Sequence, residues 1–215
     1  MNIAWILLYT LVTHGLEIIM FFKVDGISFT IDKIFKGFLL KFLLAAIVTT
    51  FNYLVLTDYL SYFIEPLFGL SLSFLLLRGL SKRFLFFYGL FPIVLMDIFY
   101  RSVSYFVFPF FGKGIVDKGS NPIFLLMTIF VCFIVLAFLK WLNYDFTSLR
   151  KEILDKGFQK SLTTINWIMG AYFLVMENLS YFEYAYDIQS KTVRHLILVF
   201  YLLFLWGLSR NWIPI

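Results

Sequence analysis

The residues that could do chemistry in this 215-residue sequence are a few ionisable side chains set inside long apolar stretches. Asp97 and Arg101 are four residues apart, the spacing and order that let an acid and a base meet on one helix face. Glu65 and Glu177 interrupt two other apolar stretches. A charge at the bilayer centre costs at least about 2.5 to 3.5 kcal/mol on insertion scales, so each group needs a partner or water. The expected chemistry is therefore ion pairing and the binding of a charged ligand.

Three more ionisable residues lie in the first two apolar stretches. His14 stands one turn before Glu17 and is expected to be its hydrogen-bonded partner. Glu17 and Lys41 are expected to pair near the inner ends of their helices. Two interpretations of that pair stay open, a structural clasp between neighbouring helices and a switchable ion pair.

The motifs of several enzyme classes do not occur in the sequence. There is no GxGxxG or GxxxxGK[ST] loop to hold phosphates. An intramembrane protease would need paired glutamates and histidines for metal-activated water, and neither EE nor a suitable histidine pair occurs. The only cysteine, Cys132, allows no zinc-type spacing. We therefore expect no catalytic residue, no metal and no cofactor.

The composition indicates the elements that position these residues. Hydrophobic residues make up 61% and charged residues 14% of the chain, whereas soluble domains are about half apolar and a quarter charged. Soluble enzymes and disulfide scaffolds are thus excluded, and the continuous apolar stretches disfavour an outer-membrane barrel. The net charge of +5 comes from short basic clusters between apolar stretches, which are topology signals and not a nucleic-acid surface. The sequence predicts an all-α, polytopic transmembrane helical bundle.

About seven spans are expected, and six is the alternative count because the last is short. Together they form one transmembrane domain, 1–210, followed by the start of a cytoplasmic tail, 211–215. Twelve Lys and Arg residues fall on one side of the seven spans and five on the other, which predicts an outer N-terminus and an inner C-terminus. The predicted spans are 3–22, 38–56, 62–77, 84–104, 122–139, 162–179 and 193–208.

In this topology several acidic and aromatic residues gather toward the outer surface. Glu65, Asp97 and Glu177 lie near the outer ends of their spans, and outer loops cover 105–121 and 181–191. A cationic amphipathic peptide would suit such a surface, in a helix-in-groove mode of recognition. An interfacial aromatic belt with independently solvated glutamates is the alternative. The candidate ligand-binding residues are Glu65, Asp97, Arg101, Tyr105, Glu177, Glu183 and Asp187.

Four stretches carry a resemblance to a known family. They are IAWILLYTLVTHGLEIIMFFKVDGISFT at the start, FYGLFPIVLMDIFYRSVSYFV from Phe87 to Val107, the following GKGIVDKGS, and the basic FTSLRKEILDKGFQK. The chain resembles, over nearly its whole length, the membrane sensor region of streptococcal peptide-pheromone receptor histidine kinases of the competence and bacteriocin quorum-sensing type.

The resemblance implies a bacterial plasma-membrane receptor that binds a secreted peptide and controls a cytoplasmic histidine kinase, with a homodimer as a further expectation. The sequence departs from the family in lacking the kinase domain, since its histidines, His14 and His195, lie in apolar surroundings. A response regulator would be reached only through that missing domain. The partners expected are the peptide and the lipid bilayer, without nucleic acid. The alternative function is a standalone membrane protein for bacteriocin immunity or transport.

Overall fold

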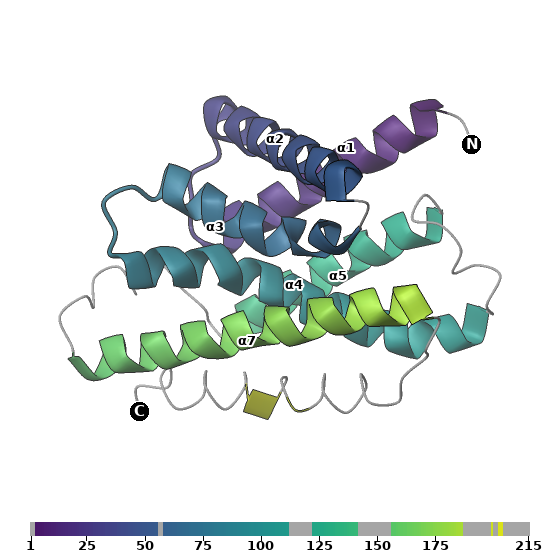
Figure 1. Ribbon diagram of the computed structural model, residues 1–215. Helices are drawn as coiled ribbons and strands as arrows, with labels where there is room; N and C mark the ends of the chain where they lie inside the picture. Colours follow the sequence, from purple (N-terminus) through teal and green to yellow (C-terminus); the bar gives the residue numbers. More distant parts are fainter. Residues whose placement is uncertain are drawn as a thin grey trace. The chain divides into compact units, whose positions relative to one another are not determined.

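The computed structural model of the chain describes residues 3–55, 58–111, 122–141 and 156–186, together with the single positions 199, 202 and 203. Every regular element in these residues is a helix (Figure 1), which confirms the predicted helical class. The helices belong to two compact units. Unit 1 comprises Met1–Phe38 and Leu95–Ser148, and unit 2 comprises Leu39–Val94 and Leu149–Ile215.

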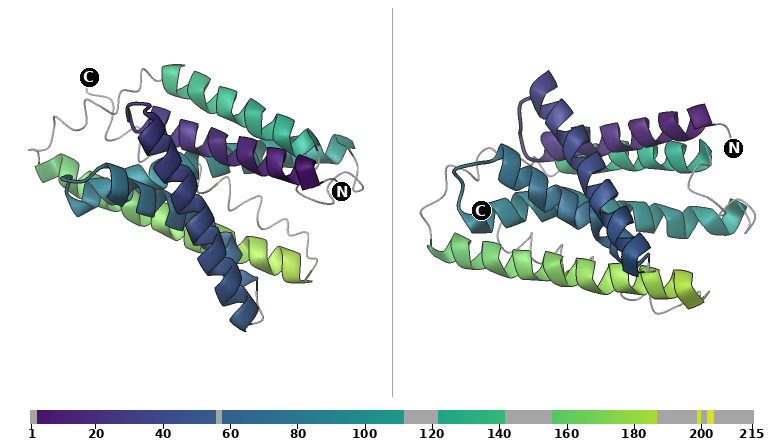
Figure 2. Two further views of the ribbon diagram at one scale, coloured as in Figure 1. Left: turned by 90° about the horizontal axis from the view of Figure 1, so that it is seen from above. Right: turned by 45° about the horizontal axis from the view of Figure 1, so that its top comes forward.

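Unit 1 is built around two helices, α1 (Ile3–Val24) and α5 (Pro122–Trp141). They pack against each other, and both views in Figure 2 show them side by side. The second half of α4 (Lys82–Phe111) joins this unit, where the rings of Phe99 and Phe138 lie 5.4 Å apart. Apolar side chains of α1 and α5 are buried here, so these helices form the core of the unit.

Helix α1 ends in a Schellman motif that turns the chain back. Gly26 adopts a left-handed backbone, with φ 60°. The amide of Ile27 donates to the carbonyl of Phe22 at 2.8 Å, and that of Gly26 to the carbonyl of Lys23 at 3.4 Å. These two bonds satisfy carbonyls that the helix end would otherwise leave open. The ring of Phe29 then packs 5.6 Å from the ring of Phe22, which fixes the direction of the following chain.

Unit 2 contains most of α2 (Ile31–Val55), the 3₁₀ helix η1 (Tyr59–Phe63), α3 (Ile64–Leu76), the first half of α4 and α7 (Lys156–Tyr186). Helices α3 and α4 form a hairpin whose turn holds Gly79 at φ 100°. Helix α7 contacts the start of α4, where the side-chain amide nitrogen of Asn166 donates to the backbone carbonyl of Arg83 at 2.8 Å.

The two helices of the hairpin approach closely through small residues. A Cβ added to Gly69 would lie 2.1 Å from the carbonyl oxygen of Gly89. One turn further along α3, the buried hydroxyl of Ser73 donates to the carbonyl oxygens of Leu70 and Leu85, each at 2.8 Å. Small residues allow helix backbones to approach each other in this way, which is the usual packing of helices in membranes.

Three helical segments among the described residues are long and apolar enough to cross a bilayer: Ile31–Val55, Tyr59–Leu76 and Lys82–Val103. A shorter apolar helix covers Leu125–Trp141. Most apolar side chains of α2 are exposed, including Phe35, Leu39, Phe42, Leu43 and Ile47. A soluble protein would bury such a surface, so the chain has the character of a membrane protein.

Several predicted boundaries are wrong because hydropathy marks apolar stretches and not helix ends. Helix α2 begins seven residues before the predicted span, and an ion pair between Lys36 Nζ and Asp32 Oδ2, 2.6 Å long, lies in its first turns. Helices α4 and α7 both extend beyond their predicted spans. Residues 105–111 and 181–186 are therefore helical and not loops. Of the predicted seventh span only Val199, Leu202 and Leu203 are described.

Candidate functional site

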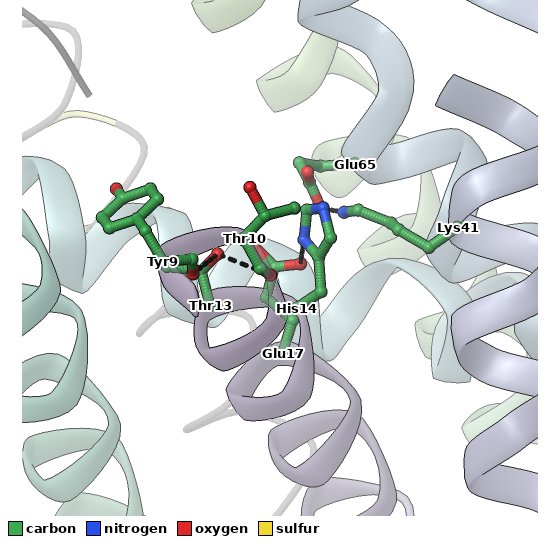
Figure 3. Close-up of polar contacts among 7 residues, drawn as sticks. All are labelled: Tyr9, Thr10, Thr13, His14, Glu17, Lys41 and Glu65. Atoms are coloured by element: carbon green, nitrogen blue, oxygen red, sulfur yellow. Dashed lines mark hydrogen bonds and ion pairs between the residues drawn. The ribbon is translucent and has the colours of Figure 1, made fainter. Parts of the chain in front are cut away.

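The polar residues of α1 form a local group in unit 1. His14 Nδ1 lies 3.2 Å from Glu17 Oε2, which confirms the predicted hydrogen bond (Figure 3). The hydroxyl of Thr13 donates to the carbonyl oxygens of Tyr9 and Thr10, at 2.9 and 3.1 Å. A threonine that donates its hydroxyl to carbonyls of its own helix is satisfied without a partner on another helix. Helix α1 thus carries an acid and a histidine in contact.

A second ion pair joins α2 to α3 in unit 2. Lys41 Nζ contacts Glu65 Oε2, as Figure 3 shows, and the ammonium also lies 4.6 Å from the centroid of the Phe68 ring. Glu65 and Phe68 are three residues apart and share one face of α3. The Lys41 side chain is 2% exposed and that of Glu65 is 42% exposed. The lysine side chain is therefore buried inside the protein, whereas the side chain of its glutamate partner is partly exposed.

This contact corrects the predicted levels of Lys41 and Glu65, which the sequence placed near opposite membrane surfaces. Lys41 is the eleventh residue of α2, about 15 Å along the helix at 1.5 Å per residue. The prediction started that helix at residue 38 and so put Lys41 close to its end. Glu65 is six residues inside the continuous segment Tyr59–Leu76. Both residues thus lie well inside their spanning segments.

Asp97 and Arg101 form the predicted pair on α4, in unit 1. Arg101 Nε donates to Asp97 Oδ2 at 2.7 Å, and both side chains are partly buried. The contact itself is confirmed. Glu65 and Glu177 belong to unit 2 and these two residues to unit 1, so the predicted convergence of all four around one pocket stays a prediction.

The other predicted site residues are located less fully. The Glu177 side chain is buried in α7, nine residues before that helix ends, which is deeper than the predicted span end at residue 179 implied. Tyr105 lies in α4 and Glu183 in α7, each in helix where the sequence predicted a loop. Asp187 lies outside the described residues.

A cluster of aromatic and amide side chains that the sequence did not predict joins η1 to α7. Tyr59 Oη donates to Asn178 Oδ1 at 2.8 Å. The ring of Tyr181 meets that of Tyr59 edge-on at 5.1 Å and that of Tyr62 at 5.9 Å. We call these four residues the tyrosine cluster. Its signal in the sequence is the spacing of three between Tyr59 and Tyr62, and between Asn178 and Tyr181.

Helix α2 is joined to η1 beside the tyrosine cluster. The amide nitrogen of buried Asn52 donates to the hydroxyl of Ser61 at 2.7 Å. Three elements of unit 2 therefore meet at η1: α2 through this hydrogen bond, α3 through chain continuity and α7 through the tyrosine cluster. A ligand that moved η1 would act on all three.

The described residues contain no group of three or more His, Cys, Asp and Glu side chains that could hold a metal ion. The arrangement instead provides acid–base ion pairs on the apolar helices and a cluster of aromatic rings at η1. Comparison of the chain with known protein families, curated proteins and solved structures found no match.

Proposed function

We propose that this chain is the membrane sensor module of a two-component quorum-sensing receptor, which binds a secreted peptide pheromone and signals to a cytoplasmic histidine kinase. The proposal places it in the bacterial plasma membrane as a multi-pass protein with seven spans, an outer N-terminus and an inner C-terminus. The apolar helices and the resemblance of its sequence stretches support this proposal. No kinase chemistry is assigned to the chain itself.

The tyrosine cluster is the observation that carries the proposal. In the proposed orientation α2 and α7 both run outward, so η1 and the end of α7 lie at the outer side. Tyrosine offers a large apolar ring with a polar tip and is enriched where proteins bind partners. Glu65 follows Tyr62 by three residues, and the side chain that carries its carboxylate is 42% exposed. A cationic amphipathic peptide would place apolar side chains on the rings and a Lys or Arg near that carboxylate.

The contact between η1 and α7 gives the proposal a route for the signal. Peptide binding at the tyrosine cluster would shift η1 against Tyr181 and Asn178, because these residues hold the two elements together. Helix α7 leads along the chain into the predicted seventh span, 193–208, and from there toward the kinase. A binding event at the outer end would thus change the position of the segment nearest the kinase.

Substitutions in the tyrosine cluster test the proposed site. Tyr181→Ala removes both ring contacts and is expected to weaken binding of a labelled cationic amphipathic peptide at least about tenfold, the loss typical of a central aromatic contact. Tyr181→Phe keeps the ring and should change affinity less than about threefold. Binding is measured by fluorescence anisotropy in nanodiscs. The control is Trp167→Ala, an exposed aromatic residue on the same helix, which should bind like the unmodified chain. Equal losses in Tyr181→Ala and Trp167→Ala would contradict the site.

Cysteine labelling tests the proposed orientation. The natural Cys132 is buried, so a Cys132→Ala background keeps the helix and removes the background thiol. In intact cells a cysteine at Asp187 should react with a membrane-impermeant maleimide, and one at Lys156 should react only after the membrane is opened. The expectation follows from the twelve-to-five asymmetry of basic residues. The reverse labelling pattern would overturn the orientation and the outer site with it.

A standalone transport or immunity protein is the second candidate. The contacts of His14 with Glu17 and of Lys41 with Glu65 favour it, because ionisable residues inside membrane helices often mark ion pathways. Proteoliposomes with an internal pH-sensitive dye distinguish the two. Two results together would favour transport: a proton flux that Glu65→Gln abolishes, and no binding of peptide by the unmodified chain.

A further inference from the structure

The turn between α3 and α4 carries a concentrated positive charge. Arg78, Lys82 and Arg83 are exposed and lie within six positions of one another, and residues 77–83 include no acid. Among the described residues, Arg78 and Lys82 have no ion-pair partner. Two cations without an ion-pair partner in the described part of the chain can attract an anion from outside.

An exposed apolar surface adjoins these cations. The rings of Phe74 and Phe86 meet edge-on at 5.9 Å across the hairpin, and each residue is 42% exposed. Lys82 is four residues before Phe86, so both lie on one face of α4, about 6 Å apart along its axis. Exposed Leu67 is seven residues before Phe74 and continues the same face of α3. Charge and apolar surface are therefore continuous along the hairpin, all within unit 2.

We propose that this surface binds one anionic phospholipid. The lipid phosphate lies between the side chains of Arg78 and Lys82, and an acyl chain follows the stripe formed by Phe86, Phe74 and Leu67. A free phosphate would be attracted by the cations alone and would leave the apolar stripe unused. A phospholipid carries its negative charge at the boundary of the hydrocarbon layer. On α4 the cation of Lys82 likewise adjoins the apolar ring of Phe86, so the phosphate and the acyl chain would each meet a matching side chain. The inference does not depend on peptide binding.

The test measures binding of phosphatidylglycerol and phosphatidylcholine with identical acyl chains to the delipidated full chain in detergent, by native mass spectrometry. Phosphatidylglycerol should bind at least about tenfold more tightly, because only it has a net negative charge. Arg78→Gln with Lys82→Gln should weaken phosphatidylglycerol binding roughly 30-fold and leave phosphatidylcholine unchanged, since each cation near a lipid surface contributes about a fivefold factor. Lys33→Gln with Lys36→Gln is the control, because it removes the same charge at the start of α2.

Two further measurements decide the ligand and protect the test against misfolding. Phe74→Ala with Phe86→Ala should weaken phosphatidylglycerol binding at least about threefold, since contact with the acyl chain is lost. Millimolar glycerol 3-phosphate should not displace the bound lipid. If the double charge variant fails to fold, Lys82→Gln alone should give about a fivefold loss. Equal losses in the Arg78/Lys82 variant and the Lys33/Lys36 control would show unspecific attraction, and displacement by glycerol 3-phosphate would show a free anion site. Either result, or an unchanged affinity in the charge variants, would overturn the proposal.

Discussion

Gly69→Ala is expected to lower the free energy of unfolding by about 3 kcal/mol, the upper range for overpacking a closely packed contact. The added Cβ would lie 2.1 Å from the backbone oxygen of Gly89 and 2.9 Å from a side-chain carbon of Ile93. A side chain can rotate away but a backbone carbonyl cannot, so α3 and α4 must separate. Ser73 would then lose its hydrogen bond to the Leu85 carbonyl. Unfolding in detergent by a denaturant series measures the change.

Gly170→Ala on α7 is the matched control. A Cβ at Gly170 has no atom of the described residues within 4 Å, so alanine should be neutral or stabilise the helix by up to about 1 kcal/mol. A stable Gly69→Ala protein would mean that the hairpin is not closely packed at this point. An equal decrease in the free energy of unfolding in both variants would show that a glycine-to-alanine change destabilises the helices whatever the space around it.

Glu65→Ala is expected to lower the free energy of unfolding by about 3 kcal/mol, because it removes a partner from a buried charge. Lys41 is 2% exposed, so its ammonium cannot move into water when the carboxylate is gone. Lys41→Met removes the buried charge and should cost less than Glu65→Ala. The double variant should therefore be more stable than Glu65→Ala alone, and a denaturant series on all four proteins gives the coupling.

The pair between Lys36 and Asp32 provides the control for this cycle. Both side chains are exposed on α2, and Asp32→Ala should change the free energy of unfolding by less than about 1 kcal/mol. If Lys41→Met proves more destabilising than Glu65→Ala, the buried lysine stabilises the bundle through contacts other than Glu65. Lys41 would then not depend on the Glu65 carboxylate for its place in the protein interior.

The sequence predicts the helices well and their ends poorly, for a physical reason visible in α2 and α7. Apolar stretches locate both helices, because a bilayer requires a continuous hydrophobic segment. Their ends lie in polar sequence, where contacts such as the one between Lys36 and Asp32 sustain the helix beyond its apolar part. Hydropathy carries no information about these contacts. The count of seven spans therefore stays a prediction.

The candidate site is predicted where its contacts are local and missed where they are distant. His14 with Glu17, and Asp97 with Arg101, lie one turn apart, and the spacing alone predicts both contacts. Lys41 and Glu65 are separated by 24 positions, and Tyr59 and Asn178 by 119. Their contacts depend on how helices pack, and no local pattern encodes that packing.

Titration in nanodiscs tests whether the chain recognises a cationic peptide, as we propose. A labelled amphipathic peptide with Lys and Arg on its polar face is titrated beside a version of equal length whose polar face carries Glu. We expect saturable binding of the cationic peptide that weakens as salt is raised, because screening reduces attraction between exposed charges. The acidic peptide should bind at least about tenfold more weakly, a difference of about 1.4 kcal/mol. Equal binding of the two peptides, or binding that does not saturate, would show that the chain has no specific site for a cationic peptide.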